Sequence, residues 1–175
     1  MRWKSLHTHG KLTSMIIFGI DPGLARVGWA VIRQEKGTLK ALIYGCITTD
    51  KEISLPHRLR AMHTELIGLF SRYKPDVVSL EEIFFAKNEK TAIMVGEARG
   101  VILLAAAECG LPVVSYSPPS VKAAITGNGK AEKLQVQRMV TRLLNLKEIP
   151  KPDDTADALA IALTHAYSYK MKGLK

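Results

Sequence analysis

Residues 15–23, Met-Ile-Ile-Phe-Gly-Ile-Asp-Pro-Gly, decide the fold of this chain. Five of the first six residues are apolar, and the run ends at Asp21, Pro22 and Gly23. A short apolar run that stops at a turn is typical of a strand buried on both faces. Asp21 is therefore expected at the end of a core strand, where a rigidly held carboxylate can act as a metal ligand or general base. The alternative is that Asp21 only starts the turn, since Asp-Pro-Gly is common in turns.

Length, charge and cysteine content narrow the class of protein. A chain of 175 residues with 47% hydrophobic residues suits one well-buried domain. The formal net charge of +9 favours a polyanionic partner, nucleic acid before a membrane surface. Cys46 and Cys109 form no Cys-x-x-Cys motif, which argues against structural zinc and a disulfide framework. No apolar run approaches a membrane span and no signal-peptide core is present, so we expect a reduced, cytoplasmic protein.

The chain divides into one domain with two short flanking segments. Residues 1–14 are polar, lack periodicity and precede a second methionine, so we expect a disordered leader outside the fold. Residues 15–169 are expected to form a single domain, and residues 170–175 a short basic tail.

Strand and helix patterns alternate along the domain and predict an α/β fold. The expected strands are 15–21, 28–33, 39–48, 77–81 and 111–116. The expected helices are 55–73, 91–109, a short N-capped helix from 117, 131–146 and 153–169. Short connections make the first three strands an antiparallel meander, whereas a helical crossover makes the fourth parallel to an earlier strand. The result is a five-stranded mixed sheet flanked by helices.

The helix at 91–109 combines an apolar stripe with many small residues, among them Gly96, Gly100 and Ala105. Small residues permit close approach of a second helix. Core packing within the chain and a dimer interface are both consistent with this pattern.

Four acidic residues lie at two expected strand ends and at the start of the last expected helix. Glu81 ends the fourth strand as Asp21 ends the first, and parallel neighbouring strands would bring the two ends to about 5 Å. Asp154 and Asp157 share one face of the first turn of the last helix. Acids there also suit the helix dipole, which is an alternative explanation. Together the four acids form a constellation that can hold two Mg²⁺ ions for phosphodiester hydrolysis.

Several motifs resemble the RuvC-type crossover junction endodeoxyribonucleases. They are Gly19-Ile-Asp-Pro-Gly, Glu81-Glu-Ile-Phe-Phe-Ala-Lys-Asn, Gly-Glu-Ala-Arg-Gly at 96–100, Ala131-Glu-Lys-Leu-Gln-Val-Gln and Asp154-Thr-Ala-Asp-Ala-Leu-Ala. The resemblance runs in order from Met15 to about Tyr167. It implies a ribonuclease H-like fold, a homodimer, symmetric nicking of four-way (Holliday) junction DNA in recombination and repair, Mg²⁺ dependence with Mn²⁺ as a substitute, and cooperation with the bacterial RuvA–RuvB branch-migration complex.

The resemblance also assigns roles to individual residues. The acidic ligands of the family fall on Asp21, Glu81, Asp154 and Asp157. Phe84 matches an aromatic residue that stacks on a base near the crossover, with core packing as the alternative. Lys122 and Lys133 match basic positions that face DNA and the scissile phosphate, where a solvated surface charge is the alternative.

The sequence pattern also gives expectations for three further residues close in sequence to these motifs. Asp153 is expected to cap the last helix, with a supporting role in the site as the alternative. Glu82 is expected to point away from the site because strand residues alternate faces. Arg99 is consistent with either a structural or a DNA-facing role.

Two other functions are compatible with parts of this pattern. A ribonuclease acting on RNA–DNA hybrids would use the same carboxylate chemistry, since a fold does not fix a substrate. A catalytically silent junction-binding protein would keep the basic surface but would not need all four acids.

Overall fold

The computed structural model describes residues 14–82 and 89–172, and leaves undescribed the side chains of residues 89–91 and 170–172. The strands are β1 (Ser14–Asp21), β2 (Arg26–Glu35), β3 (Thr38–Thr48), β4 (Val77–Glu81) and β5 (Val113–Tyr116). The helices are α1 (Leu55–Tyr73), α2 (Glu89–Glu108), α3 (Pro118–Thr126), α4 (Lys133–Leu143) and α5 (Asp153–Lys172).

The strands form one five-stranded sheet in the order β3-β2-β1-β4-β5. β1, β2 and β3 pair antiparallel, whereas β4 runs parallel to β1 and β5 runs parallel to β4. The expected mixed sheet is confirmed, and the strand to which β4 is parallel is β1.

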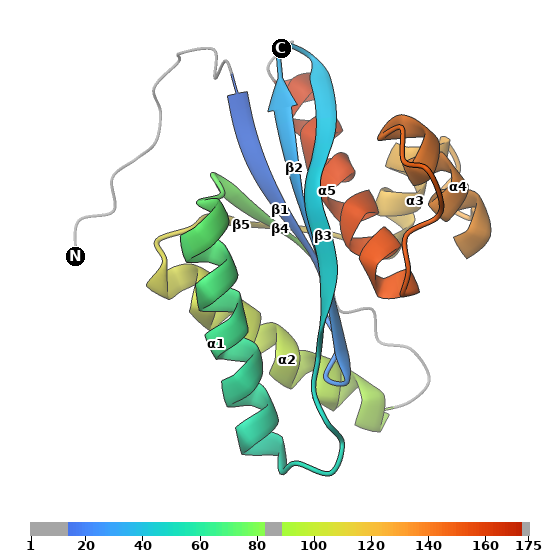
Figure 1. Ribbon diagram of the computed structural model, residues 1–175. Coiled ribbons are helices and arrows are strands. Elements are labelled where there is room, and N and C mark those ends of the chain that lie inside the picture. Colours follow the sequence, from blue (N-terminus) through green and yellow to red (C-terminus); the bar gives the residue numbers. More distant parts are fainter. Residues whose placement is uncertain (1–13, 83–88, 173–175) are drawn as a thin grey trace.

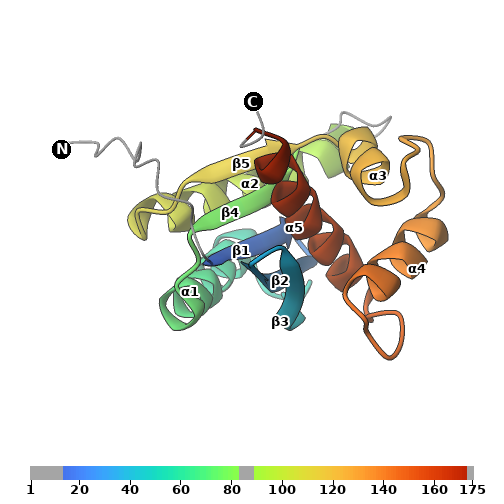
Figure 2. The same cartoon turned by 90° about the horizontal axis from the view of Figure 1, so that it is seen from above.

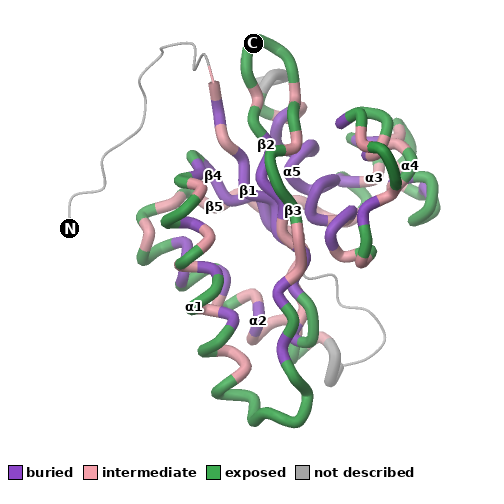
Figure 3. Tube along the Cα trace, viewed as in Figure 1, coloured by how far each residue is buried: buried purple, intermediate pink, exposed green. Residues whose placement is uncertain are grey.

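Helices cover both faces of the sheet (Figure 1 and Figure 2). α1 and α2 pack on one face around Phe18 and Ile20 of β1. α5 packs on the other face, with α3 and α4 outside it, around Ile17 of β1. β1 is therefore buried on both sides, and Figure 3 shows the buried residues concentrated along it and along α5.

Two glycines let α5 lie directly on the sheet. A Cβ atom at Gly19 would overlap the carbonyl oxygen of Ala158 and would lie 2.7 Å from the Cβ atom of Ala162. A Cβ atom at Gly28 would overlap the carbonyl oxygen of Asp154. The N-terminal turn of α5 is thus held against β2, at the residue that pairs with Asp21 of β1.

The structure corrects several expected boundaries. α5 continues to Lys172, so residues 170–172 belong to this helix and not to a separate basic tail. Likewise, β1 begins at Ser14, and α4 is shorter at both ends than the expected 131–146. The N-cap expected before α3 is confirmed, because the Ser117 side chain accepts a hydrogen bond from the backbone N–H of Ser120. Within the described residues, none of the helices is long and apolar enough to cross a membrane.

The close approach of α5 predicts opposite effects for two glycine-to-alanine substitutions. We expect Gly28→Ala to lower the free energy of unfolding by about 2 kcal/mol or more, because the added methyl group overlaps the α5 backbone. Gly68→Ala is the control, since Gly68 lies inside α1 and an added Cβ there has no neighbour within 4 Å in residues 14–82 and 89–172. It should raise the free energy of unfolding by about 0.5–1 kcal/mol. Urea denaturation of both variants measures the difference, and equal effects would contradict the close packing of α5 on β2.

Candidate active site

Asp21 and Glu81 end two adjacent parallel strands. Ile20 and Leu80 are register partners, so the two acids occupy the next position along β1 and β4. Side chains alternate along a strand, and Ile17 of β1 and Ser79 of β4 face α5, with the Ser79 hydroxyl donating to the carbonyl of Ile161 at 2.9 Å. By the same alternation, both acids face α5.

The first turns of α5 supply the other two acids. Asp154 and Asp157 are three residues apart and so lie on the same side of the helix as Ile161. Because the Asp154 backbone rests on Gly28, this turn lies beside the end of β1. The structure therefore brings together all four acids that the sequence singled out.

Burial and mutual repulsion raise the pKa values of the carboxylates. The pKa of Asp21 lies well above its ordinary value, first because of burial and then because of the charges of Glu81, Asp157 and Asp154. Burial, followed by the charge of Asp157, raises the pKa of Glu81 to about 7. Burial also raises the pKa of Asp157, against the opposing effect of Lys133. The site is thus a concentration of negative charge that a cation would stabilise.

Two basic side chains partly neutralise the cluster. Lys133, the first residue of α4, places its Nζ 2.5 Å from Asp153 Oδ2 and 2.8 Å from Asp157 Oδ2. Burial lowers the pKa of Lys133, but the bonds from the two acids outweigh it and the net shift is upward. Arg26 of β2 lies with its Nε 3.5 Å from Asp154 Oδ2.

Asp153 differs from its expected role as the cap of α5. It is the first helical residue, and its side chain accepts the hydrogen bond from Lys133. This hydrogen bond lowers the pKa of Asp153.

The donor set fits a hard divalent cation, although the side chains are not arranged around one. Among residues 14–82 and 89–172, no three acidic, histidine or cysteine side chains converge to enclose a single ion. Asp157 forms an ion pair with Lys133. Asp154 Oδ2 is buried and, within the described part of the chain, has no hydrogen-bond partner; it lies 3.5 Å from Arg26 Nε. A buried oxygen without a hydrogen-bond donor, beside three further carboxylates, suits Mg²⁺ or Mn²⁺.

A pocket of about 200 Å³ opens beside the acids. Glu81 and Asp157 line it together with Lys122 of α3 and Lys133, above an apolar floor from α3, α4 and α5. Lys122 also lowers the pKa of Glu81 through its charge, which indicates that the two side chains are near one another. Phe84, the third residue expected to bind DNA, lies outside the described residues.

Arg99, for which the sequence allowed a structural or a DNA-facing role, contacts the backbone at the end of β4. Its Nη1 donates to the backbone carbonyl of Glu81 at 2.6 Å, and its Nη2 to the hydroxyl of Ser115 at 2.8 Å. Arg99 therefore joins α2 to the ends of β4 and β5. Glu82 follows the last residue of β4 and is exposed.

Comparisons with known proteins identify the family. The family model for the crossover junction endodeoxyribonuclease RuvC matches residues 17–165. The chain belongs to the RuvC family. A RuvC of Syntrophomonas wolfei is 50% identical over 157 residues, which cover 90% of this chain and 91% of the relative. A RuvC of Rubrobacter xylanophilus is 49% identical over 162 residues, 93% of this chain and 90% of the relative.

A solved structure gives the same result for the fold. The structure described as Thermus thermophilus RuvC in complex with Holliday junction substrate matches with a TM-score of 0.86 at 39% identity, covering 90% of this chain and 96% of that one. The predicted ribonuclease H-like fold and the predicted enzyme class, crossover junction endodeoxyribonuclease, are confirmed. RuvC nucleases are in general metal-dependent.

The raised pKa of Glu81 predicts how the stability of the metal-free protein changes with pH. A carboxyl group whose pKa is higher in the folded state stabilises the fold while it is protonated, and this contribution is lost as pH rises from about 4.5 to about 7. In EDTA, we expect Glu81→Gln to raise the Tm at pH 8 by roughly 3 °C or more, with a smaller gain at pH 5. Glu82→Gln, which removes an exposed neighbouring acid, should show no such pH-dependent gain. Thermal melts across this range measure the effect, and a gain that grows toward low pH would refute it.

Proposed function

We propose that this chain resolves Holliday junctions by symmetric, metal-dependent phosphodiester hydrolysis during recombination and repair. The observation that carries the proposal is the meeting of four carboxylates at the ends of β1 and β4 and the start of α5. They lie within a basic chain that belongs to the RuvC family. A basic protein with a local acidic cluster suits a nuclease, because Lys and Arg bind the phosphate backbone while the acids hold metal.

The proposed ligands are Asp21, Glu81, Asp154 and Asp157, and the proposed metal is two Mg²⁺ ions, for which Mn²⁺ can substitute. When bound, such ions activate a water molecule for attack and stabilise the leaving oxygen. The strand ends fix Asp21 and Glu81 rigidly, whereas Asp154 and Asp157 must turn from Arg26 and Lys133 toward them.

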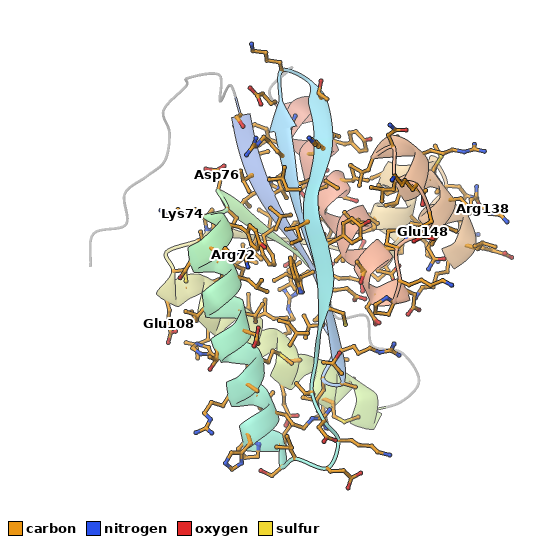
Figure 4. The ribbon with its side chains drawn as sticks, in the orientation of Figure 1. Arg72, Lys74, Asp76, Glu108, Arg138 and Glu148 are labelled. Atoms are coloured by element: carbon orange, nitrogen blue, oxygen red, sulfur yellow. The ribbon has the colours of Figure 1, made fainter. Side chains whose placement is uncertain are left out.

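Basic residues of α3 and α4 are the proposed DNA contacts. Lys122 and Lys133 line the pocket beside Glu81 and so can reach a phosphate at the site. Arg138 is exposed on the outer side of α4, where it extends the positive charge away from the sheet (Figure 4). We also propose base stacking by Phe84, on the resemblance of its motif alone.

A homodimer through α2 would give the two equivalent sites that a symmetric junction needs. Ile93, Gly100 and Leu104 recur at spacings that place them on one side of α2, opposite the buried Ala98 and Ile102. Ile93 is 63% exposed and Leu104 is 53% exposed, and an added Cβ at Gly100 would meet no atom of the described residues within 4 Å. This apolar stripe is the proposed contact with a second copy. Within the cytoplasm, we propose RuvA–RuvB as the partner complex, on family membership alone.

Cleavage of a labelled synthetic four-way junction tests the proposed activity. We expect paired symmetric nicks in Mg²⁺ or Mn²⁺ and none in EDTA. Asp21→Asn should lower the rate by about 10²-fold or more, because it removes a charged ligand from the centre of the cluster. Glu82→Gln is the matched control and should cleave like the wild type.

Duplex DNA and an RNA–DNA hybrid are run beside the junction. Cleavage of the hybrid in preference to the junction would favour the ribonuclease alternative. Tight junction binding with no cleavage in either metal would refute the catalytic mechanism.

The dimer contact predicts a separate result for Leu104. Leu104→Glu should raise the dimer dissociation constant at least about tenfold, because it places a charge in the apolar stripe. Ile53→Glu alters an equally apolar, exposed residue outside α2 and should leave association unchanged. Analytical ultracentrifugation measures both, and a Leu104→Glu variant that associates like the wild type would exclude this interface.

A further inference from the structure

The ammonium group of Lys133 contacts both Asp153 and Asp157, which differ in their surroundings. Asp157 belongs to the carboxylate cluster, since its charge acts on both Asp21 and Glu81, and its side chain is 27% exposed. Asp153 lies at the edge, with a side chain that is 49% exposed. The Lys133 side chain itself is 52% exposed. One partner therefore lies inside the proposed metal site and the other outside it.

We propose that Lys133 is the internal counter-ion of Asp157 in the metal-free protein, and that Asp153 holds its ammonium group when Asp157 binds a divalent cation. The inference rests on the proposed metal site and adds to it a positioning role for Asp153.

Charge repulsion favours such an exchange. The ammonium group of Lys133 lies 2.8 Å from Asp157 Oδ2. An ammonium group and a divalent cation on the same carboxylate repel each other. Binding of a divalent cation by Asp157 therefore weakens its contact with Lys133.

The contact with Asp153 means that the Lys133 ammonium group needs to move only a short way. Its Oδ2 already accepts a hydrogen bond from Nζ at 2.5 Å, so the ammonium group keeps one anionic partner after it leaves Asp157. The lysine stem is flexible and half exposed, and needs no backbone shift. Lys133 then stays at the rim of the pocket that it shares with Lys122, within reach of an incoming phosphate.

The proposal predicts how Asp153 affects metal affinity in the absence of DNA. Without Asp153, the ammonium group keeps only Asp157, and it competes harder with the metal. We expect Asp153→Asn to weaken Mn²⁺ binding by about two- to fivefold, the range of a partly exposed ion pair. Titration of the full chain with Mn²⁺, followed by the electron paramagnetic resonance signal of free Mn²⁺, measures this directly.

A double-mutant cycle separates this role from a general loss of negative charge. In the Lys133→Gln background no ammonium group competes for Asp157, so Asp153→Asn should have little further effect on Mn²⁺ affinity. Glu132→Gln removes another exposed acid, the residue next to Lys133, and should match the wild type.

Thermal melts provide a second measurement. Lys133→Gln should lower the Tm in EDTA, where the cluster loses its counter-ion, and should lower it less at saturating Mn²⁺, where only the half-exposed pair with Asp153 is lost. A Tm loss of equal size in both conditions would overturn the proposal, as would equal weakening by Asp153→Asn with and without Lys133.

The same titration tests the metal site independently. If Mn²⁺ binds the wild type and Asp21→Asn abolishes binding, the metal site is supported whatever Asp153→Asn does. If Asp21→Asn binds Mn²⁺ like the wild type, the proposed site and the exchange of Lys133 are both wrong.

Discussion

The acid cluster depends on the contact between α5 and the backbone of β1 and β2. At Gly19 and Gly28 there is no room for even a methyl group between helix and sheet. The helix meets this contact with small residues, since Ala158 and Ala162 face the glycine of β1. A longer separation would move Asp154 and Asp157 away from the strand ends. The position of the acids is thus set by core packing, and not by contacts among the acids themselves.

Repulsion among the acids opposes the fold that core packing imposes. Asp21 and Glu81 are held at the ends of two paired and mostly buried strands, so their backbones cannot move apart without disrupting the sheet. Burial and repulsion between these acids raise their pKa values and lower the stability of the fold. The positive charge of Lys133 offsets part of this repulsion in the metal-free protein. Charge concentrated where it lowers stability is common at functional sites, because activity and stability place different demands on the same residues.

Short-range rules of strand structure were enough to predict part of the site from the sequence. The positions of the strand ends placed Asp21 and Glu81 together, as the structure has them. The partners of the charged side chains were not predictable in this way. Arg26 lies beside Asp154, and Lys133 beside Asp153, only because β2, α4 and α5 meet in space. Nothing in the local sequence of Asp153 distinguishes a helix cap from a partner of a distant lysine.

Arg99 connects the outward-facing side of α2 to the acid cluster. It lies on α2 between Ala98, which is buried, and Gly100, which is exposed on the opposite side of the helix. Its guanidinium group donates a hydrogen bond to the backbone carbonyl of Glu81. This hydrogen bond is short, at 2.6 Å, and a second one joins the same guanidinium group to Ser115 of β5. A displacement of α2 along its axis would accordingly pull on the backbone of Glu81. The helix that carries the proposed contact with a second copy is therefore joined directly to the end of the strand that carries Glu81.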